Sequence, residues 1–113
     1  MLKRRTLPLG FIMGEESKIQ SKIIKYLESI DCYVFKTITT SKRGVSDIIG
    51  CLPTGRFIAI EVKAKGKLNN VTHLQQYHLD SVNRAGGIAF AADSLEMVKA
   101  ILSLSKHKKV IKC

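Results

Sequence analysis

The sequence predicts a single α/β domain with the element order αβββαβα, in which helices flank a central mixed β-sheet. Apolar residues recur at helical spacing near the start of the chain. Two later runs are apolar on both faces of a strand, which is typical of a sheet covered by helices on both sides. The length of 113 residues and the apolar content of 45% fit one globular domain.

An apolar stripe at helical spacing predicts a first helix over residues 15–30. The stripe consists of Ile19, Ile23, Ile24, Leu27 and Ile30. Glu16 lies on the same stripe and would face the sheet, whereas Glu15 lies about 100° away, toward solvent. Glu16 could thus reach a site on the sheet. The alternative is that it only stabilises the helix N-terminus, where acids are favoured.

Residues 32–38 are predicted to form the first strand because they are rich in β-branched and aromatic types. A polar, basic loop over residues 39–43 leads to Gly44, which would allow a sharp entry into the next strand. Two apolar strands then follow, joined by a tight turn at residues 53–55.

Three charged residues, Asp47, Glu61 and Lys63, interrupt this apolar strand pair. If the turn is centred on Thr54, antiparallel partners have numbers that sum to 108, so Asp47 faces Glu61. Side chains alternate along a strand, which places Glu61 and Lys63 on one face and Val62 on the other.

Two carboxylates this close repel unless a proton or a cation lies between them. A hard divalent ion with oxygen ligands, such as Mg²⁺ or Mn²⁺, fits that requirement. Lys63 could hold a water molecule or a phosphate oxygen beside the ion. The alternative is a buried ion cluster without catalysis, in which Glu61 and Lys63 pair and Asp47 is a cap.

Residues 64–71 are predicted to form a loop, and Thr72 is predicted to begin the second helix. The spacing from Thr72 to Gln75 fits a capping box, in which the Gln75 side chain returns to the Thr72 amide. Gln75 could also point toward the sheet and the acidic cluster. The pair Gly86–Gly87 is predicted to end this helix.

Residues 88–92 are predicted to form a fourth strand, reached through a parallel crossover. Asp93 is predicted to cap a third helix, with Glu96 three residues later. The buried stripe of this helix would be Leu95, Val98, Ile101 and Leu102. The helical pattern fades from Ser103 onward.

The formal net charge of +10 is concentrated at the two ends of the chain. We therefore divide the chain into a basic N-terminal extension (1–13), a domain (14–104) and a basic C-terminal tail (105–113). Basic arms attract polyanions, and nucleic acid is the usual one, although such arms can also simply aid solubility. Basic residues that could contact phosphates near the acidic cluster are Lys36, Lys42, Arg43, Lys65 and Lys67.

The three cysteines, Cys32, Cys51 and Cys113, show no metal-binding or disulfide spacing. The expected compartment is a reducing cytoplasm. No apolar run approaches the length needed to span a membrane, so no membrane association is expected.

An Asp followed by Glu-x-Lys on a hairpin resembles the PD-(D/E)XK nuclease superfamily, and the finer resemblance is to its VRR-NUC family, the virus-type replication–repair nucleases. Residues 44–50 resemble the first motif of that family, and residues 60–64 resemble the second. Residues 72–75, followed by Leu79 and Gly86–Gly87, resemble the third motif. Glu16, ahead of Ile19 and Gln20, resembles the acid on its first helix. One departure is Ser46, where the superfamily name has proline.

The resemblance implies metal-dependent hydrolysis of phosphodiester bonds in DNA. Asp47, Glu61 and the Val62 carbonyl would hold Mg²⁺ or Mn²⁺, and Lys63 would position the attacking water or help remove its proton. Glu16 would hold a water of the metal or a second ion. Gln75 would orient Lys63 or the phosphate.

No base-reading element is recognisable, so we expect recognition of DNA structure rather than sequence. The resemblance and the small size imply a homodimer that resolves four-way (Holliday) junctions in DNA repair or recombination, in a bacterial or phage-infected cell. Alternatives are a flap, end-processing or restriction-type nuclease, or a non-catalytic nucleic-acid-binding module. No small-molecule cofactor is expected.

Overall fold

The computed structural model describes residues 14–38 and 40–112, with side chains up to residue 105. The first half contains helix α2 (Glu15–Ser29) and strands β1 (Tyr33–Lys36), β2 (Ile48–Cys51) and β3 (Phe57–Val62). The second half contains the short 3₁₀ helix η2 (Leu68–Asn70), helix α3 (His73–Arg84), strand β4 (Ile88–Ala92) and helix α4 (Leu95–Lys112). Apart from η2, which lies in the predicted 64–71 loop, this is the predicted αβββαβα order.

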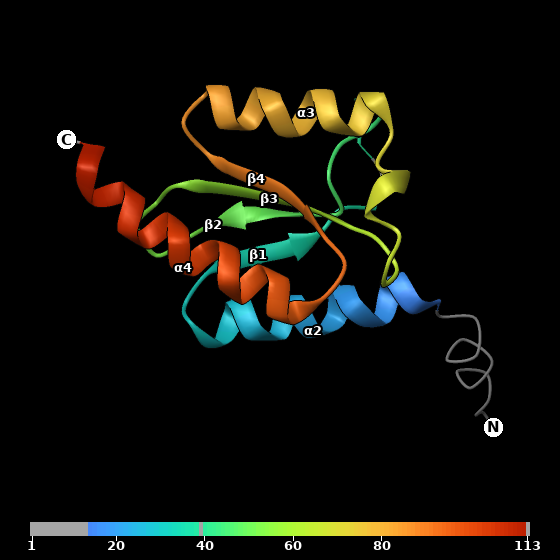
Figure 1. Cartoon of the computed structure of the whole chain (residues 1–113), viewed down its shortest axis with the longest axis horizontal. Coiled ribbons are helices and arrows are strands. Elements are labelled where there is room, and N and C mark those ends of the chain that lie inside the picture. The colour runs from blue at the N-terminus through green and yellow to red at the C-terminus, as the bar shows by residue number, and fades with distance from the viewer. Residues whose placement is uncertain (1–13, 39, 113) are drawn as a thin grey trace.

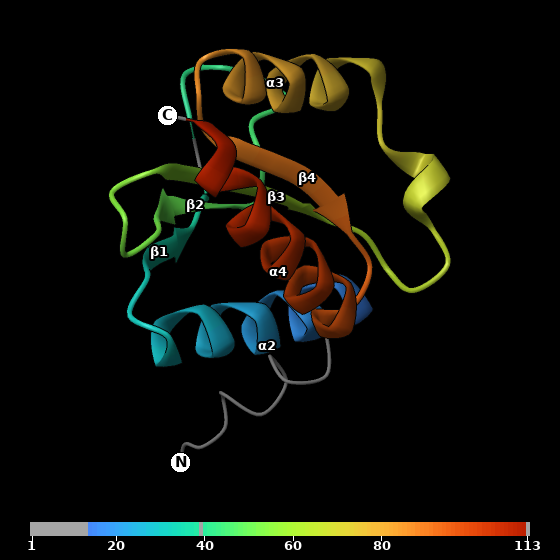
Figure 2. The ribbon, with the colours of Figure 1, turned by 60° about the vertical axis from the view of Figure 1, so that its left-hand side comes forward.

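The four strands form one mixed sheet in the order β1-β2-β3-β4, antiparallel except for the parallel pair β3–β4. Helix α3 forms the crossover between those parallel strands, as predicted. Figures 1 and 2 show three layers, with α3 on one face of the sheet and both α2 and α4 on the other. This arrangement confirms a central mixed sheet flanked by helices and is compatible with a PD-(D/E)XK-like α/β fold.

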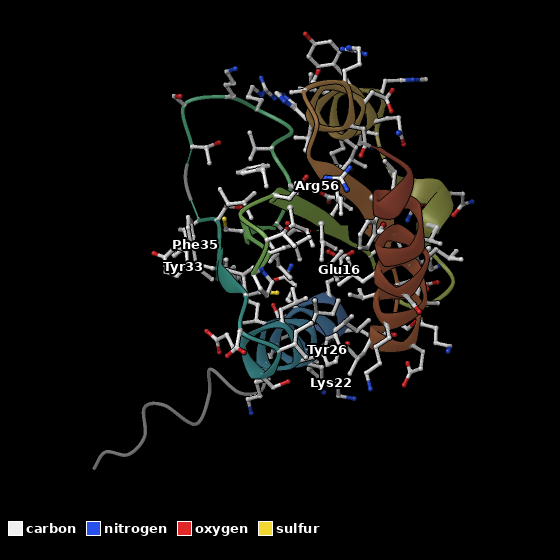
Figure 3. The ribbon with its side chains drawn as sticks, turned by 90° about the vertical axis from the view of Figure 1, so that its left-hand side faces the viewer. Glu16, Lys22, Tyr26, Tyr33, Phe35 and Arg56 are labelled. Atoms are coloured by element: carbon white, nitrogen blue, oxygen red, sulfur yellow. The ribbon has the colours of Figure 1, made fainter. Side chains whose placement is uncertain are left out.

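The strand register is the one that the sequence predicts. Residues paired between β2 and β3 have numbers that sum to 108, from Ile48–Ile60 to Cys51–Phe57. Leu52 and Arg56 close the turn with a hydrogen bond from the Leu52 amide to the Arg56 carbonyl, 2.9 Å. The Arg56 side chain donates to the carbonyls of Gly86 and Gly87, so the turn is also tied to the end of α3 (Figure 3).

Gly50 on β2 is required by a close backbone approach. A Cβ atom at this position would lie 2.0 Å from the Tyr33 carbonyl oxygen of β1. Any other residue would force β1 and β2 apart. Gly44, at φ +81°, takes the left-handed conformation that the sharp entry before β2 requires.

The sheet separates two apolar clusters. The larger one lies under α2 and α4 and includes Ile23 and Leu27 of α2, Ile58 and Ile60 of β3, and Val98 of α4. The smaller one lies under α3 and consists of buried Ala59, Leu79 and Ala89 with partly buried neighbours. Alternate β3 residues therefore serve opposite layers.

The prediction that Asp93 caps α4 was wrong by one residue. The Ser94 hydroxyl, not Asp93, accepts a hydrogen bond from the Met97 amide at 3.1 Å. Asp93 instead accepts from the Gly66 amide at 2.9 Å and so ties the loop after β3 to the start of α4. Both residue types are good caps, and the helix begins one residue later than predicted.

Two element ends also differ from the sequence prediction. β1 covers only Tyr33–Lys36 of the predicted 32–38 span, because the Cys32 amide donates to the Leu27 carbonyl and completes the end of α2. Helix α4 continues to Lys112, beyond the fading of its apolar stripe at Ser103. The N-terminal extension 1–13 lies outside the described residues. Within the described chain, no helix is long and apolar enough to cross a membrane.

Candidate functional site

Asp47 lies directly before β2, one residue beyond the last residue that pairs with β3, Ile48. Its carboxylate oxygen Oδ2 accepts a hydrogen bond from the Val62 amide at 2.8 Å. Its backbone carbonyl accepts from the Thr37 amide at 2.8 Å. The side chain therefore bridges two strands at the point where they separate, and its second oxygen stays available for another partner.

Glu61, near the end of β3, and Lys63, directly after it, form an ion pair in which the Lys63 Nζ lies 3.5 Å from the Glu61 Oε2. The two residues are 3% and 9% exposed, so both charges are almost fully removed from water. The other carboxylate oxygen, Glu61 Oε1, is buried without a hydrogen-bond partner. A buried acceptor with no donor is costly, and a cation or an ordered water would satisfy it.

The pKa of Glu61 is raised from 4.5 to about 7. Burial is the largest cause, and the nearby Asp47 carboxylate raises the pKa further. Lys63 opposes this rise through its charge and its hydrogen bond but does not cancel it. Asp47 is thus close enough for its charge to act on Glu61, and two such carboxylates need a proton or a cation between them near neutral pH.

Because side chains alternate along a strand, β3 contributes one side chain to the site and the next to the apolar core. Glu61 is on the face of the sheet that α3 packs against, in line with Ala59 of the smaller apolar cluster. Val62 points the other way and is fully buried in the larger cluster. Val62 can therefore contribute only its backbone to the site, and its amide already holds Asp47.

Thr37, which the sequence analysis did not identify, fixes the backbone on which Asp47 stands. Its hydroxyl donates to the Ser46 carbonyl at 2.9 Å and lies 3.3 Å from the Asp47 carbonyl. Ser46 is 3% exposed and takes part through its backbone, as expected for the position that departs from the superfamily name. The one feature of the sequence that could have pointed to Thr37 is its position opposite Asp47 when the β1–β2 pairing is extended by one residue.

Glu16 is in the first turn of α2, on the side of the helix toward the sheet (Figure 3), but its side chain is exposed. No group of three or more His, Cys, Asp or Glu side chains that could hold a metal ion exists among the described residues. One helical turn later, Gln20 is 6% exposed and its Oε1 has no hydrogen-bond partner.

Gln75 completes the predicted capping box of α3. The backbone amide of Gln75 donates to the Thr72 hydroxyl at 3.1 Å, and the side-chain Oε1 of Gln75 accepts from the backbone amide of Thr72 at 2.9 Å. This oxygen is engaged at the helix end, and the amide nitrogen of the side chain is the part left to contact other groups.

The five predicted phosphate-contacting residues, Lys36, Lys42, Arg43, Lys65 and Lys67, all have exposed side chains. Lys65 and Lys67 stand on the loop that directly follows Lys63. Two carboxylates hold that loop: Glu15 accepts from the Lys65 amide at 3.2 Å, and Asp93 accepts from the Gly66 amide. The loop is therefore anchored at its start, and its lysines project from a fixed backbone.

The donor set of the site fits a hard divalent cation. Asp47 and Glu61 offer carboxylate oxygens, the orphaned Glu61 Oε1 among them, and the Val62 carbonyl is the adjacent backbone oxygen. No cysteine or histidine belongs to this set, which disfavours zinc. Cys32 and Cys51, the two cysteines within the described residues, are free thiols.

The comparisons with known proteins bear on the family and the fold of the chain. The sequence model of the VRR-NUC domain matches residues 3–95. A solved structure of a VRR_NUC domain is 20% identical, with a TM-score of 0.67, over 79% of this chain and 95% of that one. A second, a VRR_NUC domain protein, is 16% identical with a TM-score of 0.63, over 80% of this chain and 86% of its own. No curated protein matches.

Proposed function

The chain belongs to the VRR-NUC domain family, a family of nucleases, and on that premise we propose that it is a metal-dependent endonuclease for branched DNA. The observation that supports this most directly is the carboxylate pair of Asp47 and Glu61 with Lys63 bound to it at 3.5 Å. Two carboxylates that can hold a metal ion, with one lysine beside them at neighbouring strand ends, suit metal-dependent hydrolysis of a phosphodiester.

Asp47, Glu61 and the Val62 carbonyl would hold Mg²⁺ or Mn²⁺. When bound, the ion would offset negative charge on the scissile phosphate and make a nearby water more acidic. Asp47 is preset for this role because the Val62 amide fixes one of its oxygens. Glu61 would exchange its proton for the ion, whose positive charge would offset both the burial of the carboxylate and the repulsion from Asp47.

Hydrolysis adds water across a P–O bond, so the attacking water must lose a proton and the leaving oxygen must gain one. Lys63 would hold the water or a phosphate oxygen, and its positive charge would assist loss of the proton to solvent, which would also supply the proton to the leaving oxygen. Its ammonium group is buried beside Glu61, which keeps it in place for that contact. Glu16 and the free end of Gln75 would act at the margin of the site, on a second ion or a water and on the phosphate.

The substrate would be recognised through its phosphates and its shape. Exposed lysines on the anchored loop after Lys63, together with Lys36, Lys42 and Arg43, supply contacts that carry no base sequence. A homodimer would place two such sites across a four-way junction, one for each strand. A flap or end-processing role uses the same chemistry and differs only in the preferred DNA.

Cleavage of a labelled four-way junction, compared with matched flap and linear duplex DNA, tests the proposal. Each DNA is incubated with Mn²⁺, with Mg²⁺ and with EDTA. Asp47→Asn and Lys63→Ala should abolish cleavage, and Asp47→Asn keeps an oxygen that can accept from the Val62 amide. Asp80→Asn on α3 and Lys22→Ala on α2 are matched controls on exposed positions.

Paired, metal-dependent cuts near the branch point, absent in both site variants, would establish junction resolution. Cuts confined to flaps or ends would retain the chemistry and change the substrate. Binding without cleavage in every metal would replace the proposal by a non-catalytic nucleic-acid-binding module.

A further inference from the structure

Only half of the sheet face that carries Glu61 is covered by a helix. Helix α3 packs mainly against β3 and β4 and leaves the β1–β2 half of that face without a helix over it. The register places three rows of side chains across it. The rows are Thr37–Asp47–Glu61, Phe35–Ile49–Ala59 and Tyr33–Cys51–Phe57.

Large aromatic side chains occupy the β1–β2 half and its border with β3. Tyr33 is 71% exposed, Phe35 is 46% exposed and Phe57 is 45% exposed. The Tyr33 and Phe35 rings contact each other edge to face, with centroids 6.0 Å apart, and both point away from the molecule (Figure 3). Val34 between them is buried on the α2 side. Clustered exposed aromatic rings mark a binding surface.

One basic residue, Lys42, borders this surface and lines a small pocket together with Phe57 and His78. Lys36 follows Phe35 on β1 and is exposed, but strand alternation turns it toward the opposite face of the sheet, the one that Val34 occupies. Aromatic rings beside positive charges are the combination by which proteins bind single-stranded nucleic acid, because bases stack on the rings and phosphates contact the charges. The paired bases of a duplex are already stacked on one another and offer the rings no free face.

From this arrangement we infer that Tyr33 and Phe35 stack unpaired bases of the DNA substrate beside the scissile phosphate. Phe35 lies one row, about 7 Å along the strand, from the row of Asp47 and Glu61. Tyr33 lies one row further. The inference rests on the proposed function and narrows it: the enzyme acts on DNA with unpaired nucleotides next to the cleaved bond.

A second copy of the chain is the competing occupant of this surface. A two-fold interface through the Tyr33–Phe35 patch would bring the patch of each copy together with its own equivalent. Lys42 borders this surface beside Phe57, and the chain carries a formal net charge of +10, so two copies would bring like charges together. This charge favours a polyanion over self-association.

The test uses the whole chain in EDTA, so that binding is separated from cleavage. The protein has no tryptophan, and Tyr33→Trp therefore introduces a single fluorophore into the patch. Titration with a short oligothymidine should quench this tryptophan by stacking. A duplex of equal length should leave it largely unchanged.

Affinity for the same oligothymidine is then measured for Tyr33→Leu and Phe35→Leu. Each should weaken binding about fivefold or more, the loss expected when one base loses its stacking partner. Duplex binding should change little. Tyr77→Leu is the matched control, because Tyr77 is 58% exposed and forms its own edge-to-face pair with His78 on α3.

Quenching together with the selective losses of affinity would support base stacking on the Tyr33–Phe35 patch. Absence of quenching with unchanged affinities would overturn it. Two further results would overturn it in favour of a second copy of the chain. The fluorescence of the Tyr33→Trp variant would change with protein concentration alone, and the leucine variants would sediment as smaller species than the wild type. Junction cleavage by the wild type and Asp47→Asn is measured in parallel. Absence of cleavage with intact oligothymidine binding would contradict the nuclease proposal alone. Cleavage without stacking on the Tyr33–Phe35 patch would contradict this inference alone.

Discussion

Glu61 links the chemistry of the site to the stability of the fold. Its pKa is about 7 in the folded chain and 4.5 as a free side chain. Between these pH values the folded state holds a proton that the unfolded state has released. Stability of the metal-free protein must therefore fall as the pH rises from 4.5 to 7.

We expect the free energy of unfolding of the metal-free chain to decrease by up to about 3 kcal/mol across this window, since one pKa unit is worth about 1.4 kcal/mol. Glu61→Gln should flatten that part of the pH profile and be more stable than the wild type above a pH of about 7. Denaturant unfolding at a series of pH values in EDTA measures both. Glu28→Gln, on the exposed surface of α2, should leave the profile unchanged. A flat wild-type profile would contradict this assignment of Glu61.

A divalent ion should reverse the same effect. Because binding to the folded state alone stabilises it, Mn²⁺ at about a hundred times its dissociation constant should add about 2.7 kcal/mol, which a thermal melt above neutral pH would detect. Asp47→Asn should lose most of this gain, while Asp80→Asn should keep it. Equal gains in both variants would place the ion elsewhere.

At the scale of elements, the starts of helices α3 and α4 show what the sequence could and could not predict. The capping box of Thr72 and Gln75 was predicted because two specific residue types occur at a fixed spacing. Asp93 and Ser94 are adjacent and both are good caps, so pattern alone could not choose between them. The choice depends on the tertiary contact of Asp93 with Gly66.

Ser94→Ala should therefore destabilise the protein by about 1 kcal/mol through the loss of its cap on α4. Urea unfolding gives the value. Ser103→Ala, in the middle of the same helix, is the comparison and should cost little, because alanine favours a helix interior. A larger cost at Ser103 than at Ser94 would argue against the cap.

Most of the strand hairpin was predictable, since the turn and the alternation fix the register, which brings Asp47 near Glu61. Thr37 was not, because a threonine in a β-branched run is an ordinary strand residue until its hydroxyl has a named partner. The need for glycine at position 50 was also hidden, because it arises from the carbonyl of a neighbouring strand. The open half of the sheet depends on where α3 packs, which periodicity does not reveal.

At the scale of the whole molecule, the formal net charge of +10 should make DNA binding strongly dependent on salt. Replacing both Lys65 and Lys67 with glutamine should reduce the slope of log affinity against log salt by about one for each lost phosphate contact. Fluorescence anisotropy over a salt series measures the slope. The control pair, Lys22→Gln with Lys25→Gln, lies on the exposed side of α2 and should change the slope less.

The hydrogen bonds that build the site join residues at very different separations along the sequence. The bond between Asp47 and the Val62 amide joins residues 15 positions apart, whereas the bonds that anchor the following loop span 50 and 27 positions. Closing a long loop costs more entropy, and distant contacts form later in folding. The two acids and the lysine can thus assemble early, on one hairpin. The lysine-bearing loop is completed last, when both ends of the domain have met.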